Sequence, residues 1–403
     1  MRELHAWENG HHVGVFSEDD EERISFAYDA NEGLPISLSL PRTGGWRDQA
    51  PRNFLDNLLP DNPNVRQAMR EHLNASSAGV FDLLDRVDAT GGLVFSLSPE
   101  PPIPSPTLRL ISDSQIANEI DRIERTRNYW WDEDSHCRFS LGGAQGKFTL
   151  SRVDGKWYWP DMMLPSTHIV KPKPHDLPEA TKVELATMRL SELCGIDTPA
   201  RGEITAQRKT AYIVERFDRR LEEGRIVRLR QEDFLQALGL PTRDKYDPSA
   251  DDCLDLLQRI DASGSLSYRW LERLAFNTSS ANSDAHAKNY SLILDPASGI
   301  RLSPQYDAVA TRYWPEFNWE LTMPLNEDHA FAEHTTPQGK VLAGISESCE
   351  GLDARMADRL NACWTKANES IEPIMPGDEP ANCLDPASAL PDSLGFPSSG
   401  RTI

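Results

Sequence analysis

The apolar pattern of this 403-residue chain changes near residue 230, and this change limits the possible folds more than any other feature. Before this point, short β-rich segments alternate with glycine- and proline-containing turns and a few helical segments. After it, apolar residues recur at helical spacing. The helices expected in this second part are Glu232–Leu238, Asp252–Ile260, Tyr268–Asn277 and Met356–Asn368. The sequence therefore predicts an α+β chain, with mixed β and α structure first and mainly helical structure second.

The first part of the chain is expected to contain both strands and helices. The expected strands are Val13–Phe16, Ile24–Tyr28, Ile36–Leu40, Gly91–Ser98, His168–Lys171 and Thr210–Phe217. The expected helices are Asn53–Leu59, Val80–Val87, Asp113–Thr126 and Lys182–Cys194. Four prolines in the segment 100–107 predict a linker, and the Pro-, Ser-, Asp- and Gly-rich end predicts a mobile acidic tail. The expected units are therefore 1–105, 106–220, 221–371 and 372–403.

Composition excludes several classes of function. The chain has 42 basic and 63 acidic residues, and its formal net charge of −21 repels nucleic-acid phosphates and anionic lipid. This charge leaves open an approach to DNA through a basic partner. The six cysteines include no CxxC pair, the first residues form no apolar signal core, and no apolar run is long enough to span a membrane. These features predict a reduced, soluble, cytoplasmic protein.

The segment Ser140–Lys147 is the first that suggests chemistry, with the sequence Ser-Leu-Gly-Gly-Ala-Gln-Gly-Lys. Small residues let backbone N–H groups approach an anion such as phosphate. The GxxxxGK[ST] spacing of a Walker loop is absent. A tight hairpin between the strand-like stretches on either side explains the segment equally well.

Lys171 stands at the end of a short apolar strand and is followed by Pro172. A buried ammonium is costly unless it meets an anion. An ATP phosphate is one such anion and a carboxylate is another, for which Glu184 in the next expected helix is the candidate. Taken alone, Lys171 is explained more simply as an exposed lysine at a strand edge.

Two polar segments follow the helical region. The stretch 282–289 brings Asp284, His286, Lys288 and Asn289 into one loop, and Asp307 follows a strand further along. In phosphoryl transfer an Asp accepts the hydroxyl proton, while an Asn and a second Asp supply oxygens to Mg²⁺. Taken singly, the loop is also explained by a polar helix cap and Asp307 by an Asx turn.

These segments occur in the order of a two-lobed kinase, and the sequence resembles the HipA family, the toxin kinases of bacterial HipBA toxin–antitoxin modules. The matching stretches are Ile36–Pro41, Phe54–Asp61, Phe81–Leu84, Ser140–Lys147, His168–Lys171, Val214–Arg219, Asp284–Asn289 and Tyr306–Asp307. The resemblance implies a protein-kinase-like fold. Its units are an additional N-terminal subdomain at 1–105, a mixed β/α N-lobe at 106–220 and a mainly helical C-lobe at 221–371.

The resemblance also implies a role for each site residue. Asp284 matches the catalytic Asp, which would orient and deprotonate the substrate hydroxyl. His286 and Lys288 lie beside it in the catalytic loop and are expected to contact phosphates. Asn289 and Asp307 match the Mg²⁺ ligands. The matches to nucleotide-binding residues are Gly142, Gly143, Ala144, Gln145, Lys147, Lys171, Glu215 and Phe217, the last two through main-chain contacts to adenine. Ser140 matches the serine that the family autophosphorylates, a modification that expels the loop.

The loop departs from the AGAQEK-like sequence of well-known members at two positions. Gly142 replaces the first Ala and Gly146 replaces Glu. Neither change removes a residue that is assigned to chemistry, but both predict a more mobile loop.

The partners implied by the resemblance are a protein substrate and an antitoxin. The substrate would be a serine of glutamyl-tRNA synthetase, whose modification blocks translation and arrests growth, a state linked to persistence. A basic, HipB-like helix-turn-helix antitoxin would neutralise the chain and carry it to operator DNA in the nucleoid. Two other interpretations remain open: a small-molecule kinase of the same broad fold, and a non-catalytic corepressor that only binds the antitoxin.

Overall fold

The computed structural model describes residues 1–330 with short gaps. The gaps are residues 48, 103–107, 127, 132–137, 162–163, 223–224, 281, 312–313, 315–319 and 326–327. The expected helix Met356–Asn368, the expected tail and most of the expected linker lie outside the described residues. Within the described residues, no helix is both long and apolar enough to cross a membrane.

The first ninety-odd residues form a four-stranded antiparallel sheet and three helices. The strands have the order β3-β2-β1-β4. They are β1 (Arg2–Glu8), β2 (His11–Glu18), β3 (Ile24–Tyr28) and β4 (Leu93–Ser96), and the helices are α1 (Ala50–Asp56), α2 (Pro63–Leu73) and α3 (Val80–Leu84). The sharp start of α2 has a local cause, since Asn62 accepts a hydrogen bond from the N–H of Asn64 and Pro63 opens the helix.

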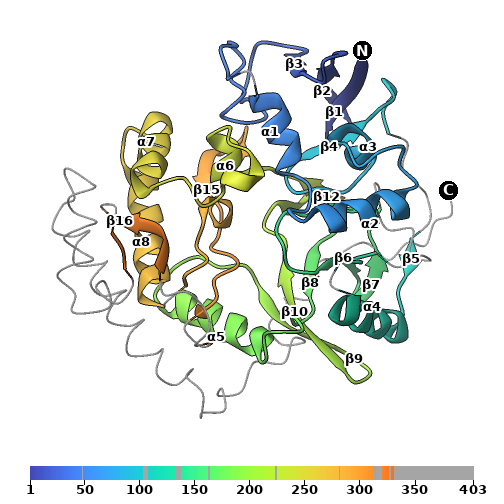
Figure 1. Cartoon of the computed structure of the whole chain (residues 1–403), viewed down its shortest axis with the longest axis vertical. Coiled ribbons are helices and arrows are strands. Elements are labelled where there is room, and N and C mark those ends of the chain that lie inside the picture. The colour runs from blue at the N-terminus through green and yellow to red at the C-terminus, as the bar shows by residue number, and fades with distance from the viewer. Residues whose placement is uncertain are drawn as a thin grey trace.

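A six-stranded antiparallel sheet follows, with the order β5-β7-β6-β8-β10-β9. Its strands are β5 (Arg109–Leu110), β6 (Phe148–Val153), β7 (Lys156–Trp159), β8 (His168–Lys171), β9 (Arg201–Ala206) and β10 (Lys209–Glu215). The helix α4 (Asp113–Thr126) packs against β9 and β10 through a buried isoleucine face, and α5 (Ala180–Leu193) lies against the same strands. Both helices therefore lie at the β10–β9 end of the sheet, and Figure 1 shows them on opposite sides of these two strands.

The remaining described chain is richer in helix and contains three small sheets. Its strands are β11 (Arg219–Glu222), β12 (Arg225–Arg228), β13 (Arg230–Asp233), β14 (Ser291–Asp295), β15 (Gly299–Leu302), β16 (Glu320–Leu325) and β17 (Asp328–Ala330). Its helices are α6 (Phe234–Ala237), α7 (Ala250–Ile260) and α8 (Ser265–Ser279), with the short 3₁₀ turns η1 (Thr242–Asp244) and η2 (Ala287–Asn289). Figure 1 shows α7 and α8 on the opposite side of the molecule from α4.

Two large hydrophobic cores support these elements. One extends from Leu4 to Ile213 in sequence and is shared by the first two sheets and the helices α1 to α4. The other extends from Phe234 to Met323 and is built mainly from α6, α7, α8 and β14. The mixed α/β fold was therefore predicted correctly. A mainly helical second part stays a prediction, because the described residues after Asp218 contain about as many strand residues as α-helix residues. The boundaries of the individual domains stay a prediction, and the first core crosses the boundary expected at residue 105.

Several expected elements differ from the structure. Ile36–Leu40 is not a strand, because Ser37 and Leu38 bond to the side-chain carboxyl group of Glu232 instead of to a neighbouring strand. The helix expected at Val80–Val87 ends at Leu84, where Asp85 becomes extended and bridges to Phe95. The helix expected from Glu232 begins at Phe234, because Glu232 and Asp233 belong to β13 and Asp233 caps the helix.

The segment Ser140–Lys147 is not the turn of a hairpin. Phe148 begins β6, which pairs with β7 and β8, whereas Phe139 makes only an isolated bridge to Asp88. The two flanks of the loop therefore pair with different parts of the molecule. This arrangement leaves the loop open on one side, where the candidate site lies.

Candidate active site

One pocket of about 540 Å³ gathers nearly all the residues singled out in the sequence. Its lining includes Gly142, Gly143, Ala144, Gln145, Lys147, Lys171, Glu215, Phe217, Asp284, His286, Lys288, Asn289 and Asp307. Ser140 is the exception, since it lies behind the loop and is completely buried. A volume of this size is typical of small-molecule sites.

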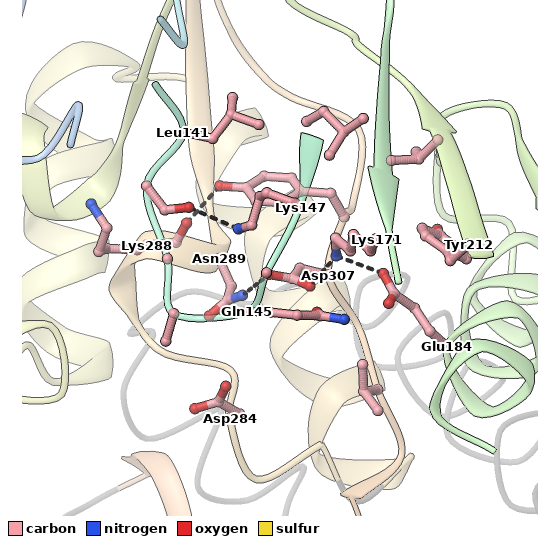
Figure 2. Close-up of a pocket in the computed structure, with 18 of the residues that line it drawn as sticks. Leu141, Gln145, Lys147, Lys171, Glu184, Tyr212, Asp284, Lys288, Asn289 and Asp307 are labelled. Carbon is pink, nitrogen blue, oxygen red and sulfur yellow. Dashed lines mark hydrogen bonds and ion pairs between the residues drawn. The ribbon is translucent and has the colours of Figure 1, made fainter. Parts of the chain in front are cut away.

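Lys171 is the central charge of the pocket. Its ammonium lies 2.7 Å from Oε1 of Glu184 in α5 and 2.5 Å from Oδ1 of Asp307, as Figure 2 shows. Lys171 and Glu184 are buried, whereas the side chain of Asp307 is 38% exposed. The strand-edge explanation of Lys171 is therefore wrong, and the buried ammonium has the carboxylate partner that its burial requires.

The charges of this group are coupled. Burial opposes ionisation, but the ammonium groups of Lys171 and Lys147 lower the pKa of Asp307 to about 2. The same carboxylates of Asp307 and Glu184 outweigh burial and raise the pKa of Lys171 above its ordinary value. Burial raises the pKa of Glu184. Lys171 and Asp307 are therefore an ion pair at neutral pH.

The glycine loop lies across one wall of the pocket. Lys147 donates from Nζ to the carbonyl oxygen of Gly142 at 2.8 Å, and Gln145 donates to the carbonyl of Pro172 at 3.4 Å. Burial lowers the pKa of Lys147 to about 8. Gly143 has a φ of +94°, which a residue with a side chain rarely adopts. The loop is thus held by its own lysine in a conformation that suits glycine.

The polar loop after α8 supplies the opposite wall. Asp284 accepts a hydrogen bond from the hydroxyl of Tyr246 at 3.0 Å, and burial raises the pKa of Asp284. Asn289 lies beside Asp307, with Nδ2 at 3.4 Å from Oδ2, and its Oδ1 accepts from the N–H of His286 at 3.2 Å. Burial lowers the pKa of His286 to about 3, so its ring is neutral at physiological pH. Figure 2 shows Asp284 apart from the Lys171–Asp307 pair, across open space.

Lys288 lies in the same loop but uses its ammonium elsewhere. Its Nζ donates to Oδ1 of Asn57 and to Oδ2 of Asp233, each at 2.8 Å. Figure 2 shows this side chain turned away from Asp307. The role of Lys288 in contacting phosphate stays a prediction, and its contacts here hold the loop against the N-terminal part of the chain.

Glu215 and Phe217 line the far end of the pocket. The ring of Phe217 lies 5.2 Å from that of Tyr306, and Glu215 ends β10. The backbone N–H of Glu215 already donates to the carbonyl of Ala200 at 2.8 Å. The backbone N–H of Arg216 likewise donates to the carbonyl of Thr167 at 2.8 Å. A ligand that binds this edge through the main chain would therefore use neither of these two N–H groups.

Some residues of the site were not found in the sequence. Tyr246 and Lys245 lie beside Asp284; Lys245 lines the pocket, and Tyr246 is half exposed. Asp61 and Asn57 reach the loops from the far N-terminal region. The sequence signal for Asn57 and Asp61 was the stretch Phe54–Asp61, which matches the family. It indicated family membership but no role for either residue in the site.

Comparison with known proteins agrees with this picture. The HipA N-terminal domain matches residues 4–94, and the HipA-like C-terminal domain matches residues 139–370. "Putative kinase Y4mE" of Sinorhizobium fredii is 32% identical over 352 residues, which cover 83% of each chain. The serine/threonine-protein kinase toxin HipA of Shewanella oneidensis is 29% identical over 316 residues, covering 73% of this chain and 71% of that one.

The solved structures give a similar result. HipA from the complex of HipA, HipB and operator DNA of Shewanella oneidensis superimposes with a TM-score of 0.70 and 25% identity, covering 93% of this chain and 98% of that one. Fold and sequence together define a HipA-like kinase. The chain belongs to the HipA family, as the resemblance predicted.

Proposed function

We propose that the chain is an ATP- and Mg²⁺-dependent kinase that transfers the γ-phosphate of ATP to a serine or threonine of a protein. The observation that carries this proposal is the bridge from Lys171 to both Glu184 and Asp307. The bridge joins β8 to the helix that follows it and to Asp307, 136 positions further along the chain, opposite Asp284 and beside the glycine loop. Kinases use a lysine paired with a helix glutamate and a metal-binding aspartate in this way to place phosphates.

The donor set of the site suits Mg²⁺. Asp307 is partly exposed toward the pocket, and the amide of Asn289 lies beside it. Carboxylate and amide oxygens are hard ligands, and magnesium commonly takes only one or two from the protein while phosphates and water complete its shell. Asp307 and Asn289 would hold the ion, and the bound ion would neutralise charge on the nucleotide phosphates.

The protein's own residues would carry out the remaining steps. Lys171 would orient the phosphates through its buried ammonium, and the glycine loop would cover them with backbone N–H groups. Asp284 would orient the substrate hydroxyl and accept its proton. The raised pKa of Asp284 suits this role, because a stronger base accepts a proton more readily.

The first prediction concerns Asp284. Asp284→Asn keeps the shape of the side chain but removes the proton acceptor, so transfer of label from γ-labelled ATP should fall by about a hundredfold to ten-thousandfold. Asp255→Asn, on the exposed side of α7, is the matched control and should transfer label at the wild-type rate. Full turnover in folded Asp284→Asn would contradict the proposal, as would unphosphorylated wild-type protein that labels nothing.

The same assay tests the substrate. We propose glutamyl-tRNA synthetase by family resemblance, with translation and growth blocked as a result. Label on the synthetase that disappears with Asp284→Asn would support this choice. Label on the kinase alone would retain the reaction and exclude that substrate. Label on a metabolite alone would favour a small-molecule kinase.

The proposal includes an antitoxin partner and autophosphorylation. A HipB-like antitoxin bound to operator DNA accompanies HipA in the Shewanella complex. The net charge of −21 is complementary to such a basic, DNA-binding partner.

Ser140 is the expected site of autophosphorylation, and its phosphate would compete for the N–H groups of the glycine loop.

The second prediction concerns Ser140. Its hydroxyl is fully buried and donates to the carbonyl of Leu58 at 2.7 Å, so it can react only after the loop has moved. Ser140→Ala should therefore remove autophosphorylation, and wild-type protein should acquire phosphate at Ser140 slowly. Phosphopeptide mapping over time measures both, with the exposed Ser298→Ala as control. Undiminished self-labelling of Ser140→Ala would contradict this assignment.

A further inference from the structure

The segment that follows α1 contacts both loops of the candidate site. Within it, Leu58 accepts from Ser140, Asn57 accepts from Lys288, and Asp61 accepts from the N–H of Gly143. This segment belongs to the region matched by the HipA N-terminal domain, whereas the two loops belong to the C-terminal domain. The N-terminal domain therefore forms part of the wall of the site.

Asp61 makes the most direct of these contacts. Its Oδ1 accepts from the N–H of Gly143 at 3.0 Å, and its own N–H lies 3.3 Å from the carbonyl oxygen of Gly143. Its Oδ2 accepts from Nζ of Lys245, also at 3.0 Å. Both carboxylate oxygens thus have a partner, and the side chain is only 13% exposed. Charge-assisted bonds of this kind are stronger than neutral ones.

Lys245 in turn is fixed to the catalytic loop. Its carbonyl oxygen accepts from the N–H of Ala287 at 3.2 Å, and its neighbour Tyr246 donates to Asp284. One carboxylate therefore joins the glycine loop to the segment that carries Asp284.

Lys147 and Gln145 hold the carbonyl of Gly142 and the end of the loop near Pro172, and Asp61 is the hydrogen-bond partner of the Gly143 N–H at the tip. Gly142 lies so close to the N-terminal domain that a Cβ would be 3.2 Å from the carbonyl oxygen of Asn57, and Gly143 has the left-handed backbone noted above. Glycines at both positions allow many conformations. A contact from outside the loop is therefore needed to select the loop conformation that faces Asp284.

Building on the proposed kinase function, we propose that Asp61 of the N-terminal domain is a positioning residue, which holds the glycine loop through Gly143 and aligns it with the catalytic loop through Lys245. It touches no reacting atom. It acts by fixing the N–H groups of the loop where the nucleotide phosphates bind, so its loss should affect ATP binding more than overall folding.

Asp56 provides a matched control. It lies five residues earlier, accepts from Arg66 and from Thr242, and so also joins the N-terminal domain to the C-terminal one. None of its hydrogen bonds in the described residues goes to the glycine loop. A general role in holding the domains together would affect Asp56 and Asp61 variants alike.

The test compares full-length Asp61→Ala, Asp61→Asn and Asp56→Asn. Hydrogen exchange of the segment 141–147 is measured without nucleotide, and KM for ATP and kcat are measured with it. Asp61→Ala should speed exchange of the Gly143 amide and raise KM for ATP, each by about tenfold, the scale expected for a lost charge-assisted hydrogen bond. The exchange rate and the KM of Asp61→Asn should lie between those of wild type and Asp61→Ala, because the amide oxygen of the new side chain can still accept from the N–H of Gly143. Asp56→Asn should match wild type in both.

Equal exchange and equal KM in Asp61→Ala and Asp56→Asn would overturn the proposal. If Asp61→Ala does not fold, Lys245→Met takes its place, since it removes the second contact of the same carboxylate and should also speed exchange of the loop. The exchange measurement requires no phosphoryl transfer. A wild-type protein that transfers no phosphate would therefore overturn the proposed function, while the exchange result still decides the role of Asp61.

Discussion

At the scale of single residues, Glu232 shows how a buried carboxyl can serve as a neutral contact. It is completely buried in β13, where it accepts from the hydroxyl of Ser37 and from the N–H of Leu38. Both donors are uncharged. Burial therefore raises the pKa of Glu232 to about 8. The folded protein keeps a proton on this group at pH values where the unfolded chain has released it.

The third prediction follows from this difference. Because the folded pKa lies above the unfolded value of 4.5, the unfolding free energy should fall as pH rises from about 4.5 to about 8. One such group gives a slope of at most about 1.4 kcal/mol per pH unit. Glu232→Gln keeps an acceptor for Leu38 but cannot ionise. Its stability should be close to that of wild type at pH 5 and higher at pH 8.

Chemical denaturation of both proteins at pH 5, 6, 7 and 8 measures this effect. The difference between the two profiles isolates Glu232 from the other titrating groups. Parallel profiles would show that the folded carboxyl titrates normally, contrary to the prediction.

Sequence reasoning was most successful where burying one side chain has an evident free-energy cost. A buried lysine requires an anion, and this requirement made Glu184 a candidate partner of Lys171 beside an ATP phosphate; the fold confirms the contact with Glu184. The alternative of an exposed lysine at a strand edge, which was simpler for Lys171 alone, is wrong. The partners of Lys288 could not be found in this way, because Asn57 lies 231 positions away and Asp233 lies 55 positions away. Only the folded chain brings them together.

At the scale of elements, glycines determine how closely β4 approaches β13. Gly91 precedes β4 with a φ of +81°, and a Cβ there would lie 2.8 Å from the carbonyl oxygen of Gln231. Its N–H donates to Asp218 at 2.8 Å. The position therefore combines a left-handed backbone with direct contact to another strand.

The fourth prediction compares two glycines. Gly91→Ala should destabilise the protein by about 3 kcal/mol, since it adds a steric clash to the cost of a left-handed alanine. Gly155→Ala, in the turn between β6 and β7, should cost only about 1 kcal/mol, because its φ is also positive but nothing lies within 4 Å of a Cβ. Urea denaturation gives both values. Equal losses would show that β4 can move away from β13 at no cost.

Elements were predicted best where the local pattern decides the outcome. The helix Asp113–Thr126 has the predicted bounds because its apolar residues recur at helical spacing and form one buried face, made by Ile116, Ala117, Ile120 and Ile123. Ile36–Leu40 has an equally regular alternation but no neighbouring strand, and Glu232 satisfies its polar groups instead. The hairpin alternative for the glycine loop failed for the same reason, since strand partners are a property of the whole fold.

At the scale of the whole molecule, a buried cluster of charges joins the N-terminal domain to the C-terminal one. Asp88 lies within 3.6 Å of the guanidinium groups of Arg216, Arg219 and Arg228. Arg216 and Arg219 also contact Asp218. These arginines hold the pKa of Asp88 well below its usual range in spite of its burial. The convergence of three arginines on one N-terminal aspartate could not be predicted from the sequence, because only the folded chain brings these residues together.

This cluster has a consequence for how such proteins can evolve. A chimera that joined the N-terminal domain of one relative to the C-terminal domain of another would bury three arginines against whatever residue replaced Asp88. An unmatched charge at such a site costs several kcal/mol, which is a large share of the stability of a typical domain. Recombination between relatives should therefore succeed only when the acid and its arginines are inherited together, so the two domains form one heritable unit.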